Sequence, residues 1–444
     1  MKTCSRIAFT FVIASMLLML ISCATFSDGA PMDSYGGSYD TMSPMSPDAS
    51  PDKGYEDGSA EGSDADLPSD DSAEERPEEN VYLPAGMITA GAHNDNVYYS
   101  DWLRLFAQGE EKNGKFYNYI YPDSDWGFNS LNRISVTVTC GDAFVAGATV
   151  DATDAQGNVL FSAVSDANGK AYLFTDSDSG KIRVTSGDGE AELTFDKENR
   201  DLSVNLDSCG EKRNVIEIML VVDVTGSMGD EINFLKAELA DVINRIAQNN
   251  SGAEIKLAML FYRDKDDKVP FDYYDFTNVT NSVGMFVQQI ALEKQSATGG
   301  GDYPEAVDQA LDLAVNKQWS TGATTKIIFH VLDAPAHEGS EYATRLVNAT
   351  KTAAAKGIRI CPIICSGAAE STEYTMREAA IYTGGTFIFV TDDSGIGNSH
   401  HDPDLPNTTI ELLNSLMVRL VNGYHTGDFG TPVYWKQDPN LNNK

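Results

Sequence analysis

The chain has 444 residues, of which 42% are hydrophobic, so it is long enough to bury more than one core. Its formal net charge of −34 at pH 7 argues against a nucleic-acid partner, because such binding depends on Lys and Arg neutralising phosphates. A strongly acidic surface instead favours solubility and attracts divalent cations.

The N-terminus predicts an export signal over residues 1–22. A basic start is followed by an apolar run, Ile7 to Ile21, which is long enough for a signal core but short for a membrane span. Leu20-Ile21-Ser22-Cys23 resembles the lipobox of bacterial lipoproteins, which implies cleavage and a lipid at Cys23 that holds the chain on a membrane. A plain secretory signal is the alternative. We expect a lipid-anchored, exported protein of the cell envelope, at the outer membrane or cell surface.

Residues 23–80 are predicted to be a disordered acidic linker. From residue 24 onward they hold sixteen Asp or Glu against only Lys53 and Arg76, among many Ser, Gly and Pro. Low hydrophobicity and high like charge cannot offset the entropy cost of ordering, and self-repulsion extends such a chain. We favour a tether over a specific acidic interaction tail.

Residues 81–132 form an aromatic-rich segment whose fold class the sequence leaves open. Its apolar residues between Tyr98 and Phe106 partly follow helical spacing, with Ser100 or Asp101 as a candidate cap. A later aromatic run could form an exposed binding face. Packing against the next domain is the interpretation that we favour.

Residues 133–210 predict a small β-sandwich. Ile134 to Cys140 alternates with period two, and turn clusters rich in Asp and Gly separate short strands at regular spacing. Further expected strands are Ala148 to Ala152, Val159 to Val164, Lys170 to Phe174, Lys181 to Thr185, Glu190 to Phe195 and Leu202 to Leu206.

Two motifs in this region, Val145 to Val150 and Ser165 to Ala171, resemble carboxypeptidase-regulatory-like or bacterial Ig-like modules. The resemblance implies a spacer or adhesion accessory with no chemistry of its own. Its Asp-rich turns could hold calcium, but ordinary hairpin turns favour the same residues. Cys140 and Cys209 bracket the sandwich and could close it as a disulfide outside the cytosol.

Residues 214–424 alternate strand and helix, which predicts an α/β fold with a doubly wound, mainly parallel sheet covered on both faces. Residues 425–444 are assigned to a C-terminal tail, and Cys361 and Cys365 are expected to be small buried hydrophobes. Expected strands are Val215 to Asp223, Ile255 to Tyr262, Lys326 to Leu332, Ile358 to Ile364 and Phe387 to Val390, with Phe271 to Phe276 as an edge strand. Expected helices are Glu231 to Ile246, Val283 to Leu292, Glu305 to Val315, Ala343 to Ala355, Glu373 to Tyr382 and Ile410 to Val421.

Oxygen-bearing side chains follow three of these segments. Asp223 ends the first strand and Thr225 and Ser227 follow it, Asp302 and Glu305 lie in a glycine-rich loop, and Asp333 follows a later strand. Strands of a parallel sheet end at one edge, where open α/β folds place their ligand crevices. Carboxylates and hydroxyls together suit a small hard cation.

These motifs, with Phe261 to Asp264 and Trp319, resemble the von Willebrand factor A family, particularly the branch with a GGGD-x-PE loop. The family implies a metal-ion-dependent adhesion site in which Asp223, Thr225 and Ser227 match the first loop, Asp333 the last acidic position, and Asp302 or Glu305 the middle loop. The expected ion is Mg²⁺, with Ca²⁺ or Mn²⁺ as alternatives. Many members carry Thr in the middle loop, so an acid there weakens attraction for an acidic ligand.

The sequence therefore predicts a surface-exposed adhesion or protein-binding module that engages a protein partner through a divalent ion. An envelope scaffold with a structural metal is the alternative, and a metal-dependent hydrolase is a third. Catalysis is disfavoured because Thr225 stands where a haloacid dehalogenase has a second Asp, and Gly226 to Gly229 does not form a nucleophile elbow. The pairs His337-Glu338 and His400-His401 also lack zinc-site spacing.

Overall fold

The computed structural model describes residues 83, 87–110, 112–120, 126–392, 405 and 408–442. The expected signal peptide, the lipidation site Cys23, the acidic linker and His400-His401 lie outside these residues. Within the described part of the chain, no helix combines the length and apolar character that a membrane span needs.

An eight-stranded sheet forms the centre of the α/β part, in the order β12-β11-β10-β13-β14-β15-β1-β16. Five neighbouring strands are parallel, which confirms the expected doubly wound, mainly parallel sheet: β11 (Glu254–Tyr262), β10 (Val215–Asp223), β13 (Thr325–Leu332), β14 (Ile358–Ile364) and β15 (Phe387–Val390). The edge strand β12 (Phe271–Asn278) is antiparallel to β11.

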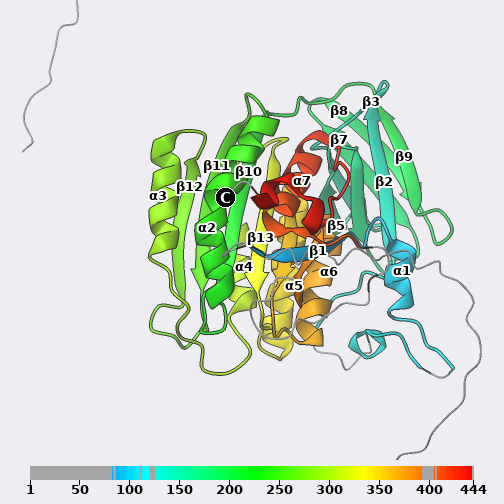
Figure 1. Ribbon diagram of the computed structural model, residues 1–444. Coiled ribbons are helices and arrows are strands. Elements are labelled where there is room, and N and C mark those ends of the chain that lie inside the picture. The colour runs from blue at the N-terminus through cyan, green and yellow to red at the C-terminus, as the bar shows by residue number, and fades with distance from the viewer. Residues whose placement is uncertain are drawn as a thin grey trace, which may run out of the picture. The chain divides into compact units, whose positions relative to one another are not determined.

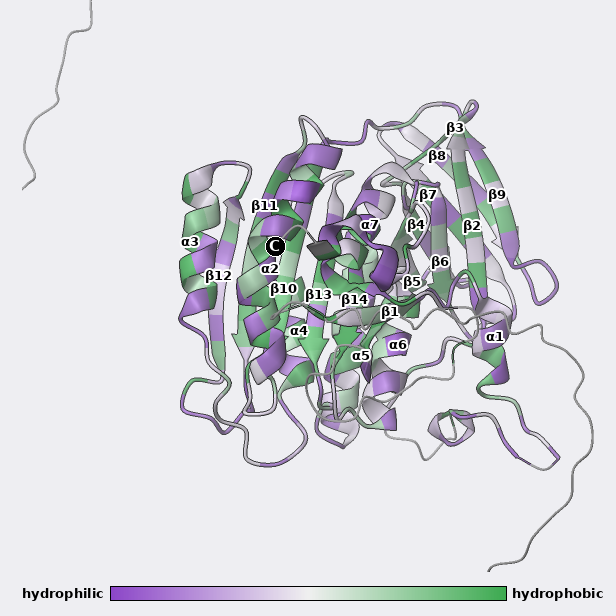
Figure 2. Cartoon of the chain, in the orientation of Figure 1, coloured by the Kyte–Doolittle hydropathy of each residue, from purple (hydrophilic) through white to green (hydrophobic). Residues whose placement is uncertain are grey.

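Helices cover both faces of this sheet, as Figure 1 shows. On one face, α2 (Gly229–Asn249), α3 (Ser282–Glu293) and α7 (Leu413–Thr426) contribute to one hydrophobic cluster. On the other, α4 (Val307–Val315), α5 (Ser340–Lys356) and α6 (Glu370–Thr383) contribute to a second. Because both faces are covered, every residue of β10 is buried, and most residues of the central strands are apolar (Figure 2).

Two helices begin later than the sequence predicts. Glu305 is not the start of α4, because its backbone forms a β-bridge with Ala336 and its N–H donates to Pro335 O at 3.0 Å. Similarly, α7 begins at Leu413, because the preceding two residues form β16 (Glu411–Leu412). Long-range backbone pairing overrides helical periodicity at both positions.

A segment from the aromatic-rich region completes the sheet. The strand β1 (Thr89–His93) is antiparallel to both β15 and β16. The chain therefore enters the α/β sheet before it forms the sandwich and returns to the sheet afterward. The tail also packs onto this end, where Trp435 is buried against Met87 and Leu412; its helical turns are η3 (Trp435–Gln437) and η4 (Pro439–Asn442).

The other aromatic residues of this region are mostly core residues. The helix α1 (Tyr99–Arg104) and the turn η1 (Tyr117–Tyr119) bring Trp102 and Phe116, both fully buried, toward Tyr374 of α6. These rings do have a packing role, but the neighbour that they contact is α6 of the α/β part rather than the domain that follows directly in sequence. The expected cap is wrong, because Ser100 and Asp101 lie inside the first turn and no side chain caps the helix.

The β-sandwich has two four-stranded sheets. One contains β3 (Ala143–Phe144), β2 (Arg133–Cys140), β6 (Lys170–Phe174) and β9 (Asp201–Leu206), and the other β5 (Val159–Val164), β4 (Thr149–Thr153), β7 (Gly180–Ser186) and β8 (Gly189–Phe195). Alternate residues of these strands face the core. Phe161 and Phe174 contact Tyr382 of α6, the latter ring stacked at 4.8 Å, so sandwich and α/β part share a core.

Candidate metal site

The candidate site lies at the edge of the sheet where the parallel strands β10 and β13 end. Asp223 is the last residue of β10, and Asp333 directly follows β13. Asp223, Thr225 and Asp333 are buried, whereas Ser227 is exposed. The structure thus places acids from two separate strands at one edge, as the strand pattern predicts.

The first loop is held by its own side chains. The backbone N–H and the hydroxyl of Thr225 donate to Asp223 Oδ1 at 2.9 and 2.7 Å. The second oxygen, Asp223 Oδ2, is buried and has no hydrogen-bond partner among the described residues. Ser227 donates to the carboxylate of Asp333, which links the first loop to the last one.

The glycine-rich middle loop packs directly on the first loop. Gly299 and Gly300 have φ angles of 85° and 76°, which favour glycine. Gly226 N–H donates to Gly299 O at 3.3 Å. A Cβ atom on Gly300 would lie 2.7 Å from Glu305 Oε1 and 3.3 Å from Thr225 Cβ, so only glycine allows this approach.

Of the two candidate acids in the middle loop, the structure brings only Glu305 to the other site residues. Its backbone pairing with Ala336 turns it inward, and it is 4% exposed. Its Oε2 atom is buried and has no hydrogen-bond partner among the described residues. Asp302 is exposed at the tip of the loop.

The buried carboxyls repel one another. Burial, followed by the charges of Asp223, Asp264, Asp267 and Asp333, raises the pKa of Glu305 to about 9. Burial raises the pKa of Asp223 to about 7, although the two hydrogen bonds from Thr225 oppose the shift. The pKa of Asp333 is also raised by burial, against the bond from Ser227. A bound cation would reverse this destabilisation of the charged forms.

Sequence reasoning missed two acids beside the site. Asp267 Oδ2 accepts from Gly300 N–H at 3.0 Å and from Asp264 N–H at 3.2 Å, so it holds the glycine loop. Glu231, in the first turn of α2, is 5% exposed, and burial together with Asp333 raises its pKa to about 7. Asp267 could have been predicted from the sequence, because it belongs to an acid-rich run that directly follows β11.

The donor chemistry fits a hard divalent cation. Asp223 Oδ2 and Glu305 Oε2 are buried oxygens that need a partner, and Thr225 and Ser227 supply hydroxyls. Among the described residues, however, no three Asp, Glu, His or Cys side chains converge closely enough to hold an ion by themselves. Hydroxyl oxygens would therefore have to complete the donor set.

The cysteines differ in their environments. Cys361 and Cys365 are buried, as expected of small hydrophobes. Cys140 and Cys209 are free thiols in this structure, and a hydrogen bond with Cys209 raises the pKa of Cys140. Both cysteines line the same surface cavity, and the disulfide remains a prediction.

Comparison with known proteins matches residues 217–392 to the family model for the von Willebrand factor A domain. Curated relatives include the alpha-protein kinase vwkA of Dictyostelium discoideum, 27% identical over 154 residues, which is 34% of this chain and 23% of that protein. A putative ariadne-like RING finger protein of Acanthamoeba polyphaga mimivirus is 26% identical over 223 residues, 47% of this chain and 21% of that protein. The chain thus spans less than a quarter of either relative.

Solved structures that are similar include the pilus adhesin SpaC of Lactobacillus rhamnosus GG, 12% identical with a TM-score of 0.31 over 48% of this chain and 30% of that one. Another is the conserved hypothetical protein BatB of Bacteroides thetaiotaomicron, 18% identical with a TM-score of 0.27 over 41% of this chain and 91% of that one. The matched family model begins inside β10 and ends just after β15, so it covers the parallel strands and both acidic loops. This chain therefore carries a von Willebrand factor A domain, at residues 217–392.

Proposed function

We propose that the protein is an interaction module that engages a protein partner through a divalent cation at the edge of its von Willebrand factor A domain. Asp223, Thr225, Ser227, Glu305 and Asp333 would hold the ion. The observation that carries the proposal is the pair of buried carboxylate oxygens, Asp223 Oδ2 and Glu305 Oε2, which have no hydrogen-bond partner among the described residues. Buried charges of this kind are costly unless they are paired or coordinate a metal.

The charge of this site favours a neutral oxygen of the partner over a carboxylate. Three carboxylates, from Asp223, Glu305 and Asp333, would leave a divalent ion at a local charge of about −1, which repels an incoming acid. A carbonyl, amide or hydroxyl oxygen carries no such penalty. We therefore infer that the partner presents an uncharged oxygen.

An aromatic side chain at the rim offers a contact surface for that partner. Tyr303 is 49% exposed. Its hydroxyl accepts from Ala369 N–H at 2.8 Å and lies 3.2 Å from Asp333 O, which ties the glycine loop to two neighbouring loops. Rigid, partly exposed tyrosines are common anchors at protein interfaces.

The lipobox-like sequence ending at Cys23 supports a location on the cell envelope. A lipid there and the acidic linker of residues 23–80 would hold the folded part away from the membrane, at the outer membrane or cell surface. Incorporation of radiolabelled palmitate that is lost in the Cys23→Ser variant tests this part of the proposal. Continued labelling of the variant would contradict it.

The interaction itself is tested by capture of partners from envelope and host extracts, with Mg²⁺ and with EDTA. We expect the Asp223→Ala variant to lose the Mg²⁺-dependent partner and to keep its fold. The matched control is Asp302→Ala, which removes an exposed acid of the neighbouring loop and should retain capture.

Other outcomes separate the alternatives. If Asp223→Ala lowers thermal stability and no metal-dependent partner is captured, the metal is structural and the protein is an envelope scaffold. Turnover of a phosphoester or peptide would instead favour a hydrolase. Calorimetric titration that shows no uptake of Mg²⁺, Ca²⁺ or Mn²⁺ by the folded protein overturns the proposal in every form.

A further inference from the structure

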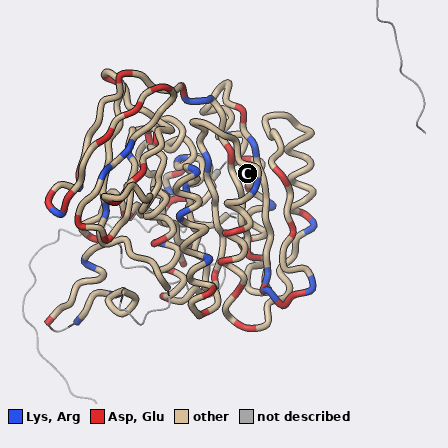
Figure 3. The backbone as a smooth tube through the Cα atoms, turned by 180° about the vertical axis from the view of Figure 1, so that it is seen from behind, with Lys and Arg blue, Asp and Glu red and all other residues tan. Residues whose placement is uncertain are grey.

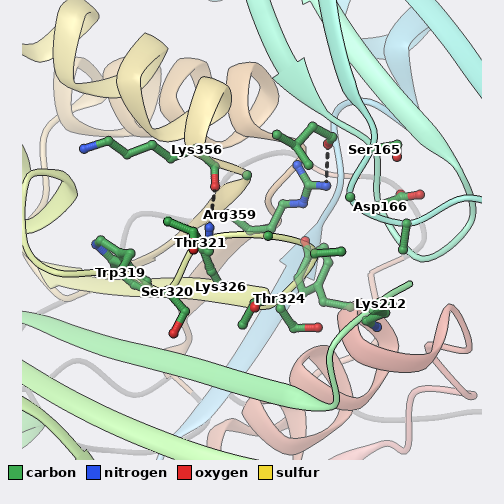
Figure 4. Close-up of a pocket in the computed structure, with 18 of the residues that line it drawn as sticks. Ser165, Asp166, Lys212, Trp319, Ser320, Thr321, Thr324, Lys326, Lys356 and Arg359 are labelled. Atoms are coloured by element: carbon green, nitrogen blue, oxygen red, sulfur yellow. Dashed lines mark hydrogen bonds between the residues drawn. The ribbon is translucent and has the colours of Figure 1, made fainter. Parts of the chain in front are cut away.

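A second candidate site lies at the opposite edge of the sheet, between the β-sandwich and the von Willebrand factor A domain. Here a cavity of about 390 Å³ is lined by the loop before β13, the end of α5 and the turn between β5 and β6 (Figure 4). Asp223 and Asp333 lie at the carboxyl ends of the strands, whereas this cavity lies where β13 and β14 begin. Its volume falls within the range of roughly 300–1,000 Å³ that is typical of small-molecule sites.

The cavity wall is basic in a strongly acidic protein. Five cations and one carboxylate line it, although the whole chain has a net charge of −34 and its Lys and Arg are interspersed with more numerous acids (Figure 3). The carboxylate, Asp166, already accepts from the N–H groups of Asn168 and Lys170 at 2.9 and 2.8 Å. The cations are Lys212, Lys317, Lys326, Lys356 and Arg359.

Four of these cations share one structural role, which explains their positions. Lys356 donates to the last carbonyl of α4, at Val315, at 2.8 Å, and Lys326 donates to the last carbonyl of α5, at Lys356, at 2.9 Å. Arg359 donates to the last carbonyl of α6, at Thr383, at 2.7 Å. Lys212 donates to His425 O, near the end of α7. Four helix C-termini therefore converge on the cavity.

These helix ends do not neutralise the cations that cap them. A helix C-terminus carries about half a negative charge, so the ends offset about half of the positive charge. Among the described residues, none of the five cations forms an ion pair with a carboxylate. Glu217, a buried acid whose charge acts on Lys326, is already paired with Lys256 at 3.4 Å and accepts from Ser320 N–H at 2.9 Å. Uncompensated positive charge remains at the cavity.

Burial strengthens the attraction of these cations for an anion. Lys326 and Arg359 are 7% and 9% exposed, so solvent screens them weakly. Burial lowers the pKa of Lys326; the charge of Glu217 opposes this shift, and the charges of Lys356 and Arg213 add to it. A protein cleft with walls of one sign concentrates the field that attracts counter-ions.

Hydrogen-bond donors remain available in the same wall. A lysine ammonium has three N–H donors, and Lys326 uses one of them on Lys356 O. Arg359 has five, and its contacts with Thr383 O and with Val164 O, at 3.0 Å, leave others. Thr324 also lines the cavity, and its buried hydroxyl has no partner among the described residues.

We propose that this cavity binds a small organic anion, a carboxylate or a phosphate ester, through the cations that cap the four helices. An oxyanion accepts several charge-assisted hydrogen bonds from Lys and Arg at once. Trp319 lies at one end of the cavity and gives an apolar surface for the uncharged body of the ligand (Figure 4). The site is separate from the metal site and does not depend on the proposed adhesive function.

Calorimetric titration of the full chain tests the proposal, with glucuronate and glucose 6-phosphate as the two anionic probes and glucose as the neutral one. We expect saturable binding of at least one anion, no binding of glucose, and weaker binding at higher ionic strength. The two anions distinguish a carboxylate from a phosphate ligand.

Charge-removing variants identify the residues responsible. Lys212→Gln combined with Lys356→Gln should weaken binding of the anion by about tenfold or more, whereas Lys356→Arg alone keeps the charge and should retain affinity. The matched control is Lys351→Gln, an exposed lysine of the same helix α5. Glu305→Gln, at the metal site, should also leave anion binding unchanged.

Hydrogen exchange on the wild-type chain gives a readout that needs no variant. The bound anion should slow exchange of backbone amides in residues 317–326, which form part of the cavity wall. The proposal is overturned if neither anion binds saturably, if glucose binds equally well, or if the double variant is folded and binds the anion with wild-type affinity.

Discussion

Arg377 and Asp95 lie 282 positions apart in the chain and form a buried, bidentate salt bridge. The guanidinium Nε and Nη2 atoms donate to the two carboxylate oxygens of Asp95 at 3.0 and 2.5 Å. Nη1 donates to Glu373 at 3.0 Å, and the Trp102 ring centroid lies 4.9 Å from the guanidinium carbon. The pair thus fastens the segment between β1 and α1 onto α6.

Removal of one partner of this pair should be costly. The Asp95→Ala variant leaves the guanidinium of Arg377 with less negative charge around it, in a site where the two side chains are 1% and 2% exposed. We expect the free energy of unfolding to fall by about 3–5 kcal/mol, measured by urea denaturation. Asp178→Ala is the control, because the ion pair of Asp178 with Lys197 is largely exposed and should contribute under about 1 kcal/mol. Equal losses would contradict the prediction.

Glu378 should make stability depend on pH. Its burial raises the pKa to about 8, although a hydrogen bond from Ser130 opposes the shift. The unfolded chain loses this proton near the ordinary value of 4.5, whereas the folded protein retains it up to about 8. The contribution of Glu378 to stability is therefore greatest below pH 4.5 and is lost progressively as the pH rises toward 8.

The Glu378→Gln variant tests whether the free energy of unfolding falls as the pH rises, because the amide of Gln cannot ionise. We expect the stability of the variant, relative to wild type, to increase by a few kcal/mol between pH 4.5 and pH 8, measured by urea denaturation at several pH values. The control is Glu341→Gln, whose side chain is 77% exposed. Parallel pH profiles for wild type and Glu378→Gln would show that Glu378 titrates normally.

Adjacent glycines of the middle loop should respond differently to alanine. A Cβ atom on Gly300 would lie 2.7 Å from Glu305 Oε1, and its φ of 76° disfavours any other residue. Gly301 has no atom within 4 Å of the equivalent position. Gly300→Ala should therefore weaken Mg²⁺ binding by about tenfold or more, whereas Gly301→Ala should bind normally, measured by calorimetry. Equal affinities would show that Glu305 is not part of the site.

The parallel strands could be predicted because they are buried on both faces. In β10 all nine residues are buried, and such a strand reads as a continuous apolar run. The strand β1 could not be found in this way, since Thr89-Ala-Gly-Ala-His93 has neither alternation nor a β-branched core. Its conformation depends on pairing with β15 and β16, which are distant in sequence.

The site could be predicted only in part. Asp223 ends one predicted strand and Asp333 follows another, so topology alone places them together. The sequence could not choose between Asp302 and Glu305, because both lie in one flexible loop. The choice depends on the pairing of Glu305 with Ala336, a contact that helical periodicity conceals.

The thiols of Cys140 and Cys209 should form a disulfide in an oxidising environment. Cys140 ends β2, which pairs in parallel with β9, and Cys209 lies shortly after β9 ends. Both residues line the same surface cavity, which places the two side chains near each other. The disulfide would close the loop between Cys140 and Cys209. It should stabilise the protein by roughly 3–5 kcal/mol, chiefly by restricting the unfolded chain.

Urea denaturation with and without reductant measures that gain. Reductant should lower the stability of wild type but have no effect on Cys140→Ser or Cys209→Ser, since either substitution removes the bridge. Cys361→Ala is the control, because it removes a buried cysteine elsewhere and should retain the redox difference. If denatured, air-oxidised protein still exposes both thiols to a thiol reagent, the two cysteines do not bond, and the sandwich depends on packing alone.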